Sequence, residues 1–150
     1  NEADDRRSVS GMEQMVFTMS AYEIGAADFF QKLQAEKTEL VLYVRLHAAS
    51  QLCGFTKEKD LAFFVPQLTG AAYVHDLIFA PEQAWLDLYR KQHISWEEYS
   101  DAYAELLAKR QALELYRRCY AGYGCVCLLG TQTRKRRSHN EWLYRLLRRQ

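Results

Sequence analysis

The sequence predicts an α/β protein: a single three-layer domain in which a mostly parallel sheet of about four or five strands carries helices on both faces, as in Rossmann-like folds. Two observations indicate this class. Short apolar runs alternate along the chain with segments whose apolar residues recur at helical spacing. The strongest run, Leu-Val-Leu-Tyr-Val-Arg-Leu at 40–46, is apolar on both faces, which is typical of a central parallel strand. A chain of 150 residues is long enough for one domain with a sizeable core.

In the first half of the chain, strands and helices are expected to alternate. The expected elements are a strand at 14–20, a helix at 26–37, the strand at 40–46, a loop at 47–55, a helix at 57–67 and a strand at 70–75. Thr56 is a suitable N-cap for the helix that follows it, because its hydroxyl can accept a hydrogen bond from the first turn. Pro66 has no N–H to donate, so we expect that helix to kink or end there.

The second half is expected to be mostly helical. The expected elements are a helix from about 80 to 92, a helix that begins at Ser95, its continuation or a second helix through Tyr120, a strand at 125–129 and a helix at 140–149. Pro81 fits a first-turn position, where its missing N–H costs nothing. Ser95 followed three residues later by Glu98 is a capping box, which predicts a helix start at that point.

We assign residues 1–12 to a flexible N-terminal extension and residues 13–150 to the single domain. The longest apolar runs are far shorter than the roughly 18 residues that a membrane-spanning helix needs. No charged segment followed by an apolar one opens the chain, so no secretion signal is expected. We therefore expect a cytoplasmic protein without a membrane partner, and we leave its oligomeric state open.

The four cysteines are expected to be free thiols, because nothing in the sequence indicates a secreted protein. Cys125 and Cys127 lie two residues apart in a predicted strand, so both side chains should lie on the same face of the sheet. A single cysteine pair is a weak zinc signal, and buried free cysteines usually pack in the core. The histidines lack the spacing of a metal site, so neither a metal nor another cofactor is expected.

The best place for a site is the edge where the parallel strands end, since open α/β sheets bind ligands there. The connection from the last strand to the last helix, 131–139, is polar and basic. Side chains that follow the other strands would reach the same edge. The candidate ligand-binding residues are Tyr22, Arg45, His47, His75, Thr131, Gln132, Ser138 and His139. No glycine-rich phosphate loop follows the first strand.

Arg45 and His139 each have a functional and a structural interpretation. Arg45 could hold a phosphate or a carboxylate through paired hydrogen bonds, or it could order a loop by pairing with Asp76 or Glu23. His139 could act as a general base, donate to an anion at the helix N-terminus, or be an exposed residue at a helix start. For Ser138 we favour an N-cap role over that of a nucleophile.

A basic segment near the end of the chain suggests another class of partner. Lys and Arg total twenty, and seven of them fall in 134–150, where Glu141 is the only acid. The basic loop residues are Arg134, Lys135, Arg136 and Arg137, and those of the last helix are Arg145, Arg148 and Arg149. If loop and helix share one surface, the segment could neutralise the phosphates of a nucleic acid. The alternative is a solvated loop.

Several short phrases follow one another in an order and spacing that resemble a known family. They are Tyr43-Val-Arg-Leu46, Gly54-Phe-Thr-Lys57, Tyr73-Val-His75, Ala80-Pro81, Ser95-Trp-Glu-Glu-Tyr99 and Cys127-Leu-Leu129. Together they resemble the bacterial domain-of-unknown-function family 488 over about 17–147. The resemblance implies a fold and a strand-end site, and it implies no particular reaction.

The resemblance also implies a set of reactive positions, of which this chain keeps two. The family carries Asp-Val-Arg at the first strong strand, where this chain has Tyr43-Val-Arg45. It carries Cys-Ser-Glu after the last strand and Cys-His-Arg at the last helix, where this chain has Gly130-Thr-Gln132 and Ser138-His-Asn140. Only Arg45 and His139 match, so any activity that depends on those thiols should be absent.

We therefore expect a non-catalytic protein that binds an unidentified anionic or nucleotide-type small ligand. Its contacts would be Arg45, His139 and the amides of the Ser138–His139 helix start. The first alternative is an enzyme acting on a nucleotide or phosphorylated substrate, with His139 as acid or base and Arg45 as anion clamp. That alternative requires both side chains to reach one small ligand. The second alternative is a nucleic-acid-associated protein that uses the basic segment 134–149.

Overall fold

The computed structural model describes residues 14–48 and 51–149, and the predicted extension at 1–12 lies outside them. The elements of the first half are β1 (Met15–Ser20), α2 (Ala26–Ala35), β2 (Leu40–Tyr43), the 3₁₀ segment η1 (Gln51–Thr56), α3 (Glu58–Thr69) and β3 (Ala72–His75). Those of the second half are η2 (Leu77–Phe79), α4 (Gln83–Arg90), α5 (Trp96–Lys109), α6 (Ala112–Tyr120), β4 (Cys125–Gly130) and α7 (His139–Arg148). Every helix in these described ranges is too short or too polar to cross a membrane.

The described strands form one sheet in which all pairs are parallel and the order is β1-β4-β2-β3. The predicted α/β class with a parallel sheet is confirmed. β4 lies between β1 and β2, and all of its residues are buried. Its continuous apolar sequence follows from this position, because both faces of a central parallel strand are covered. Since the strands run in one direction, the segments that follow Ser20, Tyr43 and Gly130 leave the sheet at the same edge.

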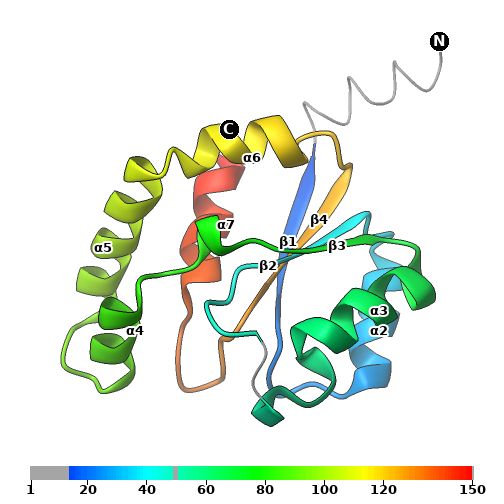
Figure 1. Ribbon diagram of the computed structural model, residues 1–150, viewed down its shortest axis with the longest axis horizontal. Coiled ribbons are helices and arrows are strands. Elements are labelled where there is room, and N and C mark those ends of the chain that lie inside the picture. Colours follow the sequence, from blue (N-terminus) through cyan, green and yellow to red (C-terminus); the bar gives the residue numbers. More distant parts are fainter. Residues whose placement is uncertain (1–13, 49–50, 150) are drawn as a thin grey trace.

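Helices cover both faces of the sheet, as Figure 1 shows. α2 and α3 pack on one face, and α7 packs on the other with α5 and α6 beside it. β2 contributes to both cores in alternation. Val41 and Tyr43 face the α2–α3 side, whereas Leu40, Leu42 and Val44 face the α7 side. The predicted arrangement of helices on both faces is confirmed.

The helix that contains Pro66 continues past the proline, contrary to the expected kink or end. α3 runs to Thr69, and Gly70 ends it in the left-handed conformation (φ 75°) with its N–H donating to the Pro66 carbonyl at 3.0 Å. The proline removes one helical hydrogen bond, but the buried Leu61 and Val65 hold α3 against the core. Packing outweighs the local preference, and the glycine sets the helix boundary.

The loop expected at 47–55 contains η1, and Thr56 is not the N-cap of the next helix. Lys57 holds the N-cap position of α3 without a side-chain hydrogen bond. The buried Thr56 hydroxyl instead donates to the Ala21 carbonyl at 3.3 Å, so it joins the segment after β2 to the segment after β1. A long-range hydrogen bond takes the place of the expected local cap.

The helix expected to have Pro81 in its first turn begins later. α4 starts at Gln83, so Pro81 lies in the connection before it. The capping box that predicted the start of α5 is confirmed. The Glu98 N–H donates to the Ser95 hydroxyl at 3.0 Å, and the Ser95 N–H donates to the Glu98 carboxylate at 3.1 Å.

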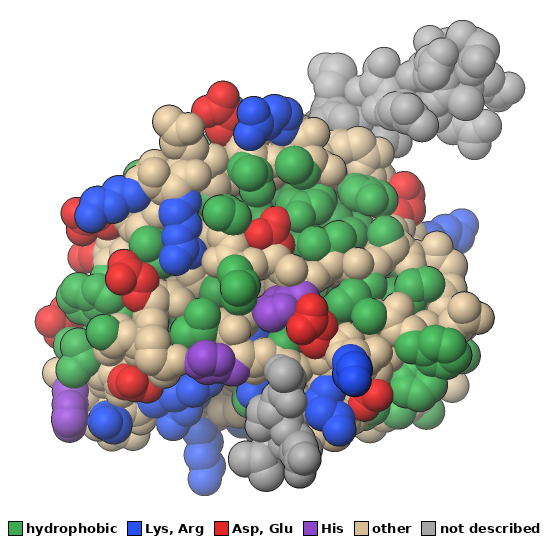
Figure 2. Space-filling model, viewed as in Figure 1, with side chains coloured by type: hydrophobic (Ala, Val, Ile, Leu, Met, Phe, Trp, Pro, Cys, Tyr) green, Lys and Arg blue, Asp and Glu red, His purple; other side chains and the backbone are tan. Residues whose placement is uncertain are grey.

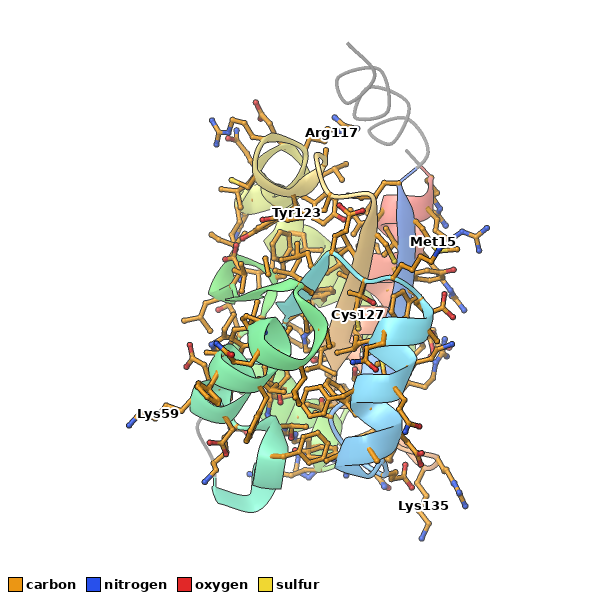
Figure 3. The ribbon with its side chains drawn as sticks, turned by 90° about the vertical axis from the view of Figure 1, so that its right-hand side faces the viewer. Met15, Lys59, Arg117, Tyr123, Cys127 and Lys135 are labelled. Atoms are coloured by element: carbon orange, nitrogen blue, oxygen red, sulfur yellow. The ribbon has the colours of Figure 1, made fainter. Side chains whose placement is uncertain are left out.

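Cys125 and Cys127 are free and buried, as predicted. Burial is the main reason that the pKa of each thiol is raised, so both stay protonated near neutral pH. Cys127 lies between the sheet and α2, among apolar side chains (Figure 3). These thiols are therefore core residues and not candidates for chemistry.

Candidate functional site

A pocket of about 430 Å³ lies at the carboxyl edge of the sheet, where the sequence placed the candidate site. It is formed by the segments after β1, β2 and β4, together with α4 and the start of α5. Figure 2 shows Lys and Arg side chains at the lower margin of the molecule, where the β4–α7 connection lies in Figure 1. The lining residues are Tyr22, Arg45, His47, Leu86, Tyr89, Arg90, Tyr99, Thr131, Thr133, Arg136, Arg137, Ser138 and His139.

The four consecutive basic residues of the β4–α7 connection divide into two pairs. Thr133 and Arg136 close a tight turn, in which the Thr133 N–H donates to the Arg136 carbonyl at 2.8 Å. All four basic residues are exposed, but Arg134 and Lys135 occupy the tip of the turn, and Figure 3 shows Lys135 extending away from the body of the protein. Arg136 and Arg137 line the pocket. Only the second pair is available to a ligand in the pocket.

Contacts on both sides hold this connection in place. On the β1 side, the Glu23 carboxylate accepts from the Arg134 N–H at 2.7 Å. On the α4 side, the Tyr89 hydroxyl donates to the Arg137 carbonyl at 2.9 Å. The Arg137 side chain pairs with Glu141. The pocket wall is thus fastened before any ligand arrives, which lowers the entropic cost of binding.

Arg45 is buried, and its guanidinium contacts two tyrosines. Its guanidinium donates to the Tyr22 hydroxyl at 2.6 Å and to the Tyr43 hydroxyl at 3.3 Å. It also lies 5.1 Å from the centre of the Tyr22 ring. The alternative pairing with Asp76 or Glu23 is not found: among the described residues neither carboxylate forms an ion pair with Arg45, and both accept from other groups. Tyr43 stands two residues before Arg45 in the extended chain, so both side chains lie on the same side and the Tyr43 hydroxyl is within reach of the guanidinium.

The other arginines of the lining differ in how they are held. Arg137 is engaged by the Glu141 carboxylate, which raises the pKa of Arg137, and lies 4.2 Å from the centre of the Trp96 ring. Arg90 ends α4, and Arg136 is the last residue of the tight turn. Among the described residues, neither Arg90 nor Arg136 has a side-chain hydrogen bond or ion pair. Guanidinium groups in this state can bind a phosphate or a carboxylate bidentately.

His139 is buried, so the interpretation as an exposed helix-start residue is wrong. Only 3% of it is exposed, and its Nε2 lies 2.6 Å from the Val44 carbonyl oxygen. A carbonyl oxygen can only accept, so Nε2 carries the proton and Nδ1 carries the lone pair. Burial lowers the pKa of His139 to about 4, against the raising effect of the bond to Val44, and the Arg90 charge lowers it further. Near neutral pH the ring is a neutral hydrogen-bond acceptor and does not donate to an anion through Nδ1.

Tyr99, another residue of the pocket lining, carries a second buried polar atom. Its ring stacks on that of Tyr89, with centres 4.4 Å apart and planes 6° apart. Burial raises the pKa of Tyr99, so its hydroxyl keeps its proton. Within the described chain, neither the Tyr99 hydroxyl nor Nδ1 of His139 has a hydrogen-bond partner. Buried polar atoms without partners are costly, so both are groups that a ligand can satisfy.

Ser138 holds the N-cap position of α7, as predicted, but its hydroxyl does not cap the helix. The hydroxyl donates to the Asn140 side-chain oxygen and accepts from the Thr131 N–H at 3.4 Å. Asn140 is fully buried against β4, and a Cβ atom on Gly130 would lie 2.2 Å from its Cγ. The direct contact between the helix start and the strand end requires a glycine at position 130.

Two of the candidate residues lie outside the pocket. His75 has its Nε2 at 2.7 Å from the Arg45 carbonyl oxygen and its Nδ1 at 3.5 Å from the Glu58 carboxylate. Gln132 is joined to β1 through its backbone carbonyl, which accepts from the Ser20 hydroxyl. The candidates that the structure brings together at the pocket are Tyr22, Arg45, His47, Thr131, Ser138 and His139.

α4 and the start of α5 supply lining residues that the sequence did not single out. Leu86 and Tyr89 lie on the apolar side of the predicted helix, and Tyr99 lies on the apolar stripe of the next one, which is typical of core residues. The one usable signal is the pair Tyr89-Arg90, because an arginine beside the apolar stripe lies at the rim of the core. No local pattern indicates that α4 lines a pocket at the carboxyl edge of the sheet.

α7 carries a second basic surface outside this pocket. A hollow of about 610 Å³ is lined by Thr18, Glu141, Tyr144, Arg145, Arg148 and Arg149. The Glu141 carboxylate pairs with Arg137 of the basic loop and, at 3.5 Å, with Arg145. The loop and the last helix therefore meet at one carboxylate.

The fold and the pocket define a class: an α/β protein with a parallel sheet and a cationic pocket at the carboxyl edge. No described cysteine lines that pocket, and the described residues contain no group of three or more His, Cys, Asp and Glu side chains that could hold a metal ion. The chain belongs to the family described as Domain of unknown function DUF488, whose model matches residues 25–147. The family resemblance found in the sequence is thereby confirmed. No curated protein and no solved structure matches the chain.

Proposed function

We propose that this protein binds a small anionic ligand, such as a phosphate ester, in the carboxyl-edge pocket without transforming it. The observation that carries the proposal is the charge of the lining. Arg45, Arg90, Arg136 and Arg137 line one pocket, and no described Asp or Glu is among the lining residues. Like charges held together repel one another, and a bound anion relieves that repulsion. Arg90 and Arg136 matter most, since neither has a described partner to give up.

The start of α7 supports the same ligand class. Ser138 and His139 line the pocket at the N-terminus of this helix, where the helix dipole places partial positive charge. The Ser138 hydroxyl does not accept from the first-turn amides. An anion at this end of the pocket would be stabilised by the helix start as well as by the guanidinium groups.

The protonation of His139 favours binding over acid–base catalysis. An effective general acid or base has a pKa near the working pH, whereas that of His139 is about 4. An enzyme is the alternative, because His139 and Arg45 do line one pocket and a bound anion would raise the pKa of the histidine. Hydrolysis or transfer of a phosphate ester, lost on His139→Gln, would establish that alternative.

Calorimetric titration with inorganic phosphate tests the proposal. The double variant Arg90→Ala/Arg136→Ala should bind phosphate about 100-fold or more weakly, because charge-assisted hydrogen bonds are each worth about 1.5–3 kcal/mol. The matched control is Arg134→Ala/Lys135→Ala, which removes the same charge from the exposed tip of the same loop and should bind like the native protein. Equal losses in both variants, or no phosphate binding by the native protein, would overturn the proposal.

Nucleic-acid association is a second candidate, favoured by the continuity of the basic loop with α7 at Glu141. Its test is fluorescence anisotropy with short RNA and DNA at several salt concentrations. Binding that weakens steeply with salt and drops in Arg145→Ala/Arg148→Ala would support it, because those side chains lie in the second hollow and not in the pocket. No binding at low salt would exclude it.

A further inference from the structure

Two residues of the pocket lining carry buried polar atoms that have no hydrogen-bond partner among the described residues and that a bare anion would leave unsatisfied. Nδ1 of His139 and the hydroxyl of Tyr99 belong to side chains that are 3% and 1% exposed, and both lack a partner among the described residues. Both residues line the pocket that Arg90 and Arg136 line. A ligand that fills this pocket must therefore do more than neutralise charge, or it leaves buried polar atoms unpaired.

The role of the His139 ring is fixed by what surrounds it. The Val44 carbonyl holds Nε2 at 2.6 Å, and the Tyr103 ring packs edge-on against the imidazole with centres 5.1 Å apart. The ring is thus held from two sides, with its proton on the nitrogen that faces Val44. Nδ1 can only accept, so the matching ligand group must be an N–H or O–H donor.

The Tyr99 hydroxyl can donate to a ligand, whereas Nδ1 of His139 can only accept from one. Its ring is held by the stacking contact with Tyr89, and its proton is available for donation. A ligand hydroxyl both donates and accepts, so a ligand with several hydroxyl groups satisfies His139 and Tyr99 together. A simple phosphate ester in its dianionic form has no O–H and cannot satisfy His139.

We infer that the pocket selects a phosphate monoester that also carries hydroxyl groups, as sugar phosphates and nucleotides do. The arginines bind the phosphate, and His139 and Tyr99 contact the hydroxyl groups and so determine specificity. This inference rests on the proposed anion-binding function and names its ligand class. A pocket of about 430 Å³ lies within the usual range for small-molecule sites, which is roughly 300–1,000 Å³.

The test compares ribose 5-phosphate with ethyl phosphate by calorimetry at pH 8, where both esters are dianions. The native protein should bind ribose 5-phosphate about ten times more tightly or better, because unpaired buried groups are worth about that factor. His139→Gln keeps an N–H that can donate to the Val44 carbonyl, but it lacks the acceptor that Nδ1 provides next to Cγ in histidine. Tyr99→Phe keeps the stacked ring without its hydroxyl. Each variant should lose about tenfold in affinity for ribose 5-phosphate and change ethyl phosphate binding less than about twofold.

The outcomes separate this inference from the function on which it rests. The inference would be overturned if the native protein bound the two esters with equal affinity. It would also be overturned if the variants lost affinity for both esters equally. Anion binding would still stand if Arg90→Ala/Arg136→Ala abolished it. Failure of both esters to bind the native protein would overturn inference and function together. Adenosine 5′-monophosphate distinguishes nucleotides from free sugar phosphates as the ligand class. If it binds more tightly than ribose 5-phosphate, the ligand is a nucleotide. If it binds more weakly, the ligand is a free sugar phosphate.

Discussion

Two histidines hold consecutive carbonyl groups at the end of β2, and their surroundings differ. Nε2 of His139 lies 2.6 Å from the Val44 carbonyl oxygen, and Nε2 of His75 lies 2.7 Å from that of Arg45. The second nitrogen of His75 faces the Glu58 carboxylate at 3.5 Å. The second nitrogen of His139 has no described partner and belongs to a pocket lined by arginines.

The difference separates a structural histidine from one that is available to a ligand. On the α3 side, the ring of His75 links two backbone segments and has a carboxylate beside it, so a ligand has nothing to add. On the α7 side, the backbone bond fixes the His139 ring and leaves an acceptor unused. A sequence pattern cannot distinguish these two cases, because His75 simply ends an apolar strand and His139 simply begins an amphipathic helix.

The largest expected effect concerns the contact between the end of β4 and the start of α7, the helix that carries His139. Gly130→Ala would place a Cβ atom 2.2 Å from Cγ of the buried Asn140 and push the start of α7 away from β4. We expect a loss of about 3 kcal/mol in the free energy of unfolding, measured in urea, because overpacked cores cost about 1–3 kcal/mol and this contact is severe. Gly25→Ala is the control, since its Cβ atom would meet nothing within 4 Å.

A double variant sharpens that test. Asn140→Ala removes the atoms that the new Cβ would meet, so Gly130→Ala should cost far less in the Asn140→Ala background than in the native protein. Equal costs in both backgrounds would mean that the contact between helix start and strand end does not hold His139 in place.

The next effect is a pH dependence of stability on the His139 side. The pKa of His139 is about 4 in the folded protein and about 6.5 in an unfolded chain. Between these values the unfolded chain binds more protons, so stability is fully present above about pH 6.5 and is lost as the pH falls to 4. At low pH the loss in the free energy of unfolding approaches about 3 kcal/mol for His139 alone.

Urea unfolding of the native protein and of His139→Gln at several pH values measures this dependence. The carboxylates titrate in both proteins and cancel in the difference. Leu143→Ala is the control, because it destabilises the same core without removing a titratable group. If the native protein and His139→Gln lost stability in parallel between pH 6.5 and 4, the histidine would not be neutral in the folded state.

A smaller effect concerns the fastening of the pocket wall. Tyr89→Phe removes the hydrogen bond to the Arg137 carbonyl and keeps the ring stacked on Tyr99. We expect a loss of about 1 kcal/mol in the free energy of unfolding, as for a typical hydrogen bond. Hydrogen exchange of the Thr133 and Arg136 amides, which are bonded to each other's carbonyls, should become faster, whereas exchange in β3 should not change. An unchanged exchange rate would show that the wall is held without Tyr89.

The smallest expected effect belongs to the His75 side. Glu58→Gln removes the charge that faces His75 across 3.5 Å, at a carboxylate side chain that is 48% exposed. Exposed ion pairs of this kind contribute about 0–1 kcal/mol to the free energy of unfolding. The midpoint temperature of thermal unfolding should therefore fall by only a few degrees. Phosphate affinity should stay as in the native protein. A change in phosphate affinity comparable to that of Arg90→Ala/Arg136→Ala would remove the distinction between the two sides.

The fold was largely predictable because its two central strands, β2 and β4, are buried on both faces. The runs at 40–46 and 125–129 are too continuously apolar for surface strands, and alternation with helices implies a parallel sheet. Boundaries were less predictable where packing opposed a local preference. α3 passes through Pro66 because Leu61 and Val65 are buried in the core, which no local rule contains.

The site was predictable only where chain direction determines it. Parallel strands end at one edge, so Arg45 and His139 were expected to lie together, and they do. Arg90 and Tyr99 were not predictable as lining residues, because their place depends on how α4 and the start of α5 pack beside that edge. The division of the basic loop depends on the turn closed by Thr133, and the burial of His139 depends on the close approach that the missing side chain of position 130 permits.

The most direct test of this account is the protonation of the His139 ring. A long-range ¹⁵N–¹H correlation spectrum at pH 7, assigned by comparison with His139→Gln, reports which ring nitrogen carries the proton. The account predicts a neutral ring with the proton on Nε2, and a change in the Nδ1 chemical shift on addition of ribose 5-phosphate. A proton on Nδ1, or an imidazolium ring at pH 7, would contradict it, because His139 would then have no acceptor to offer a ligand.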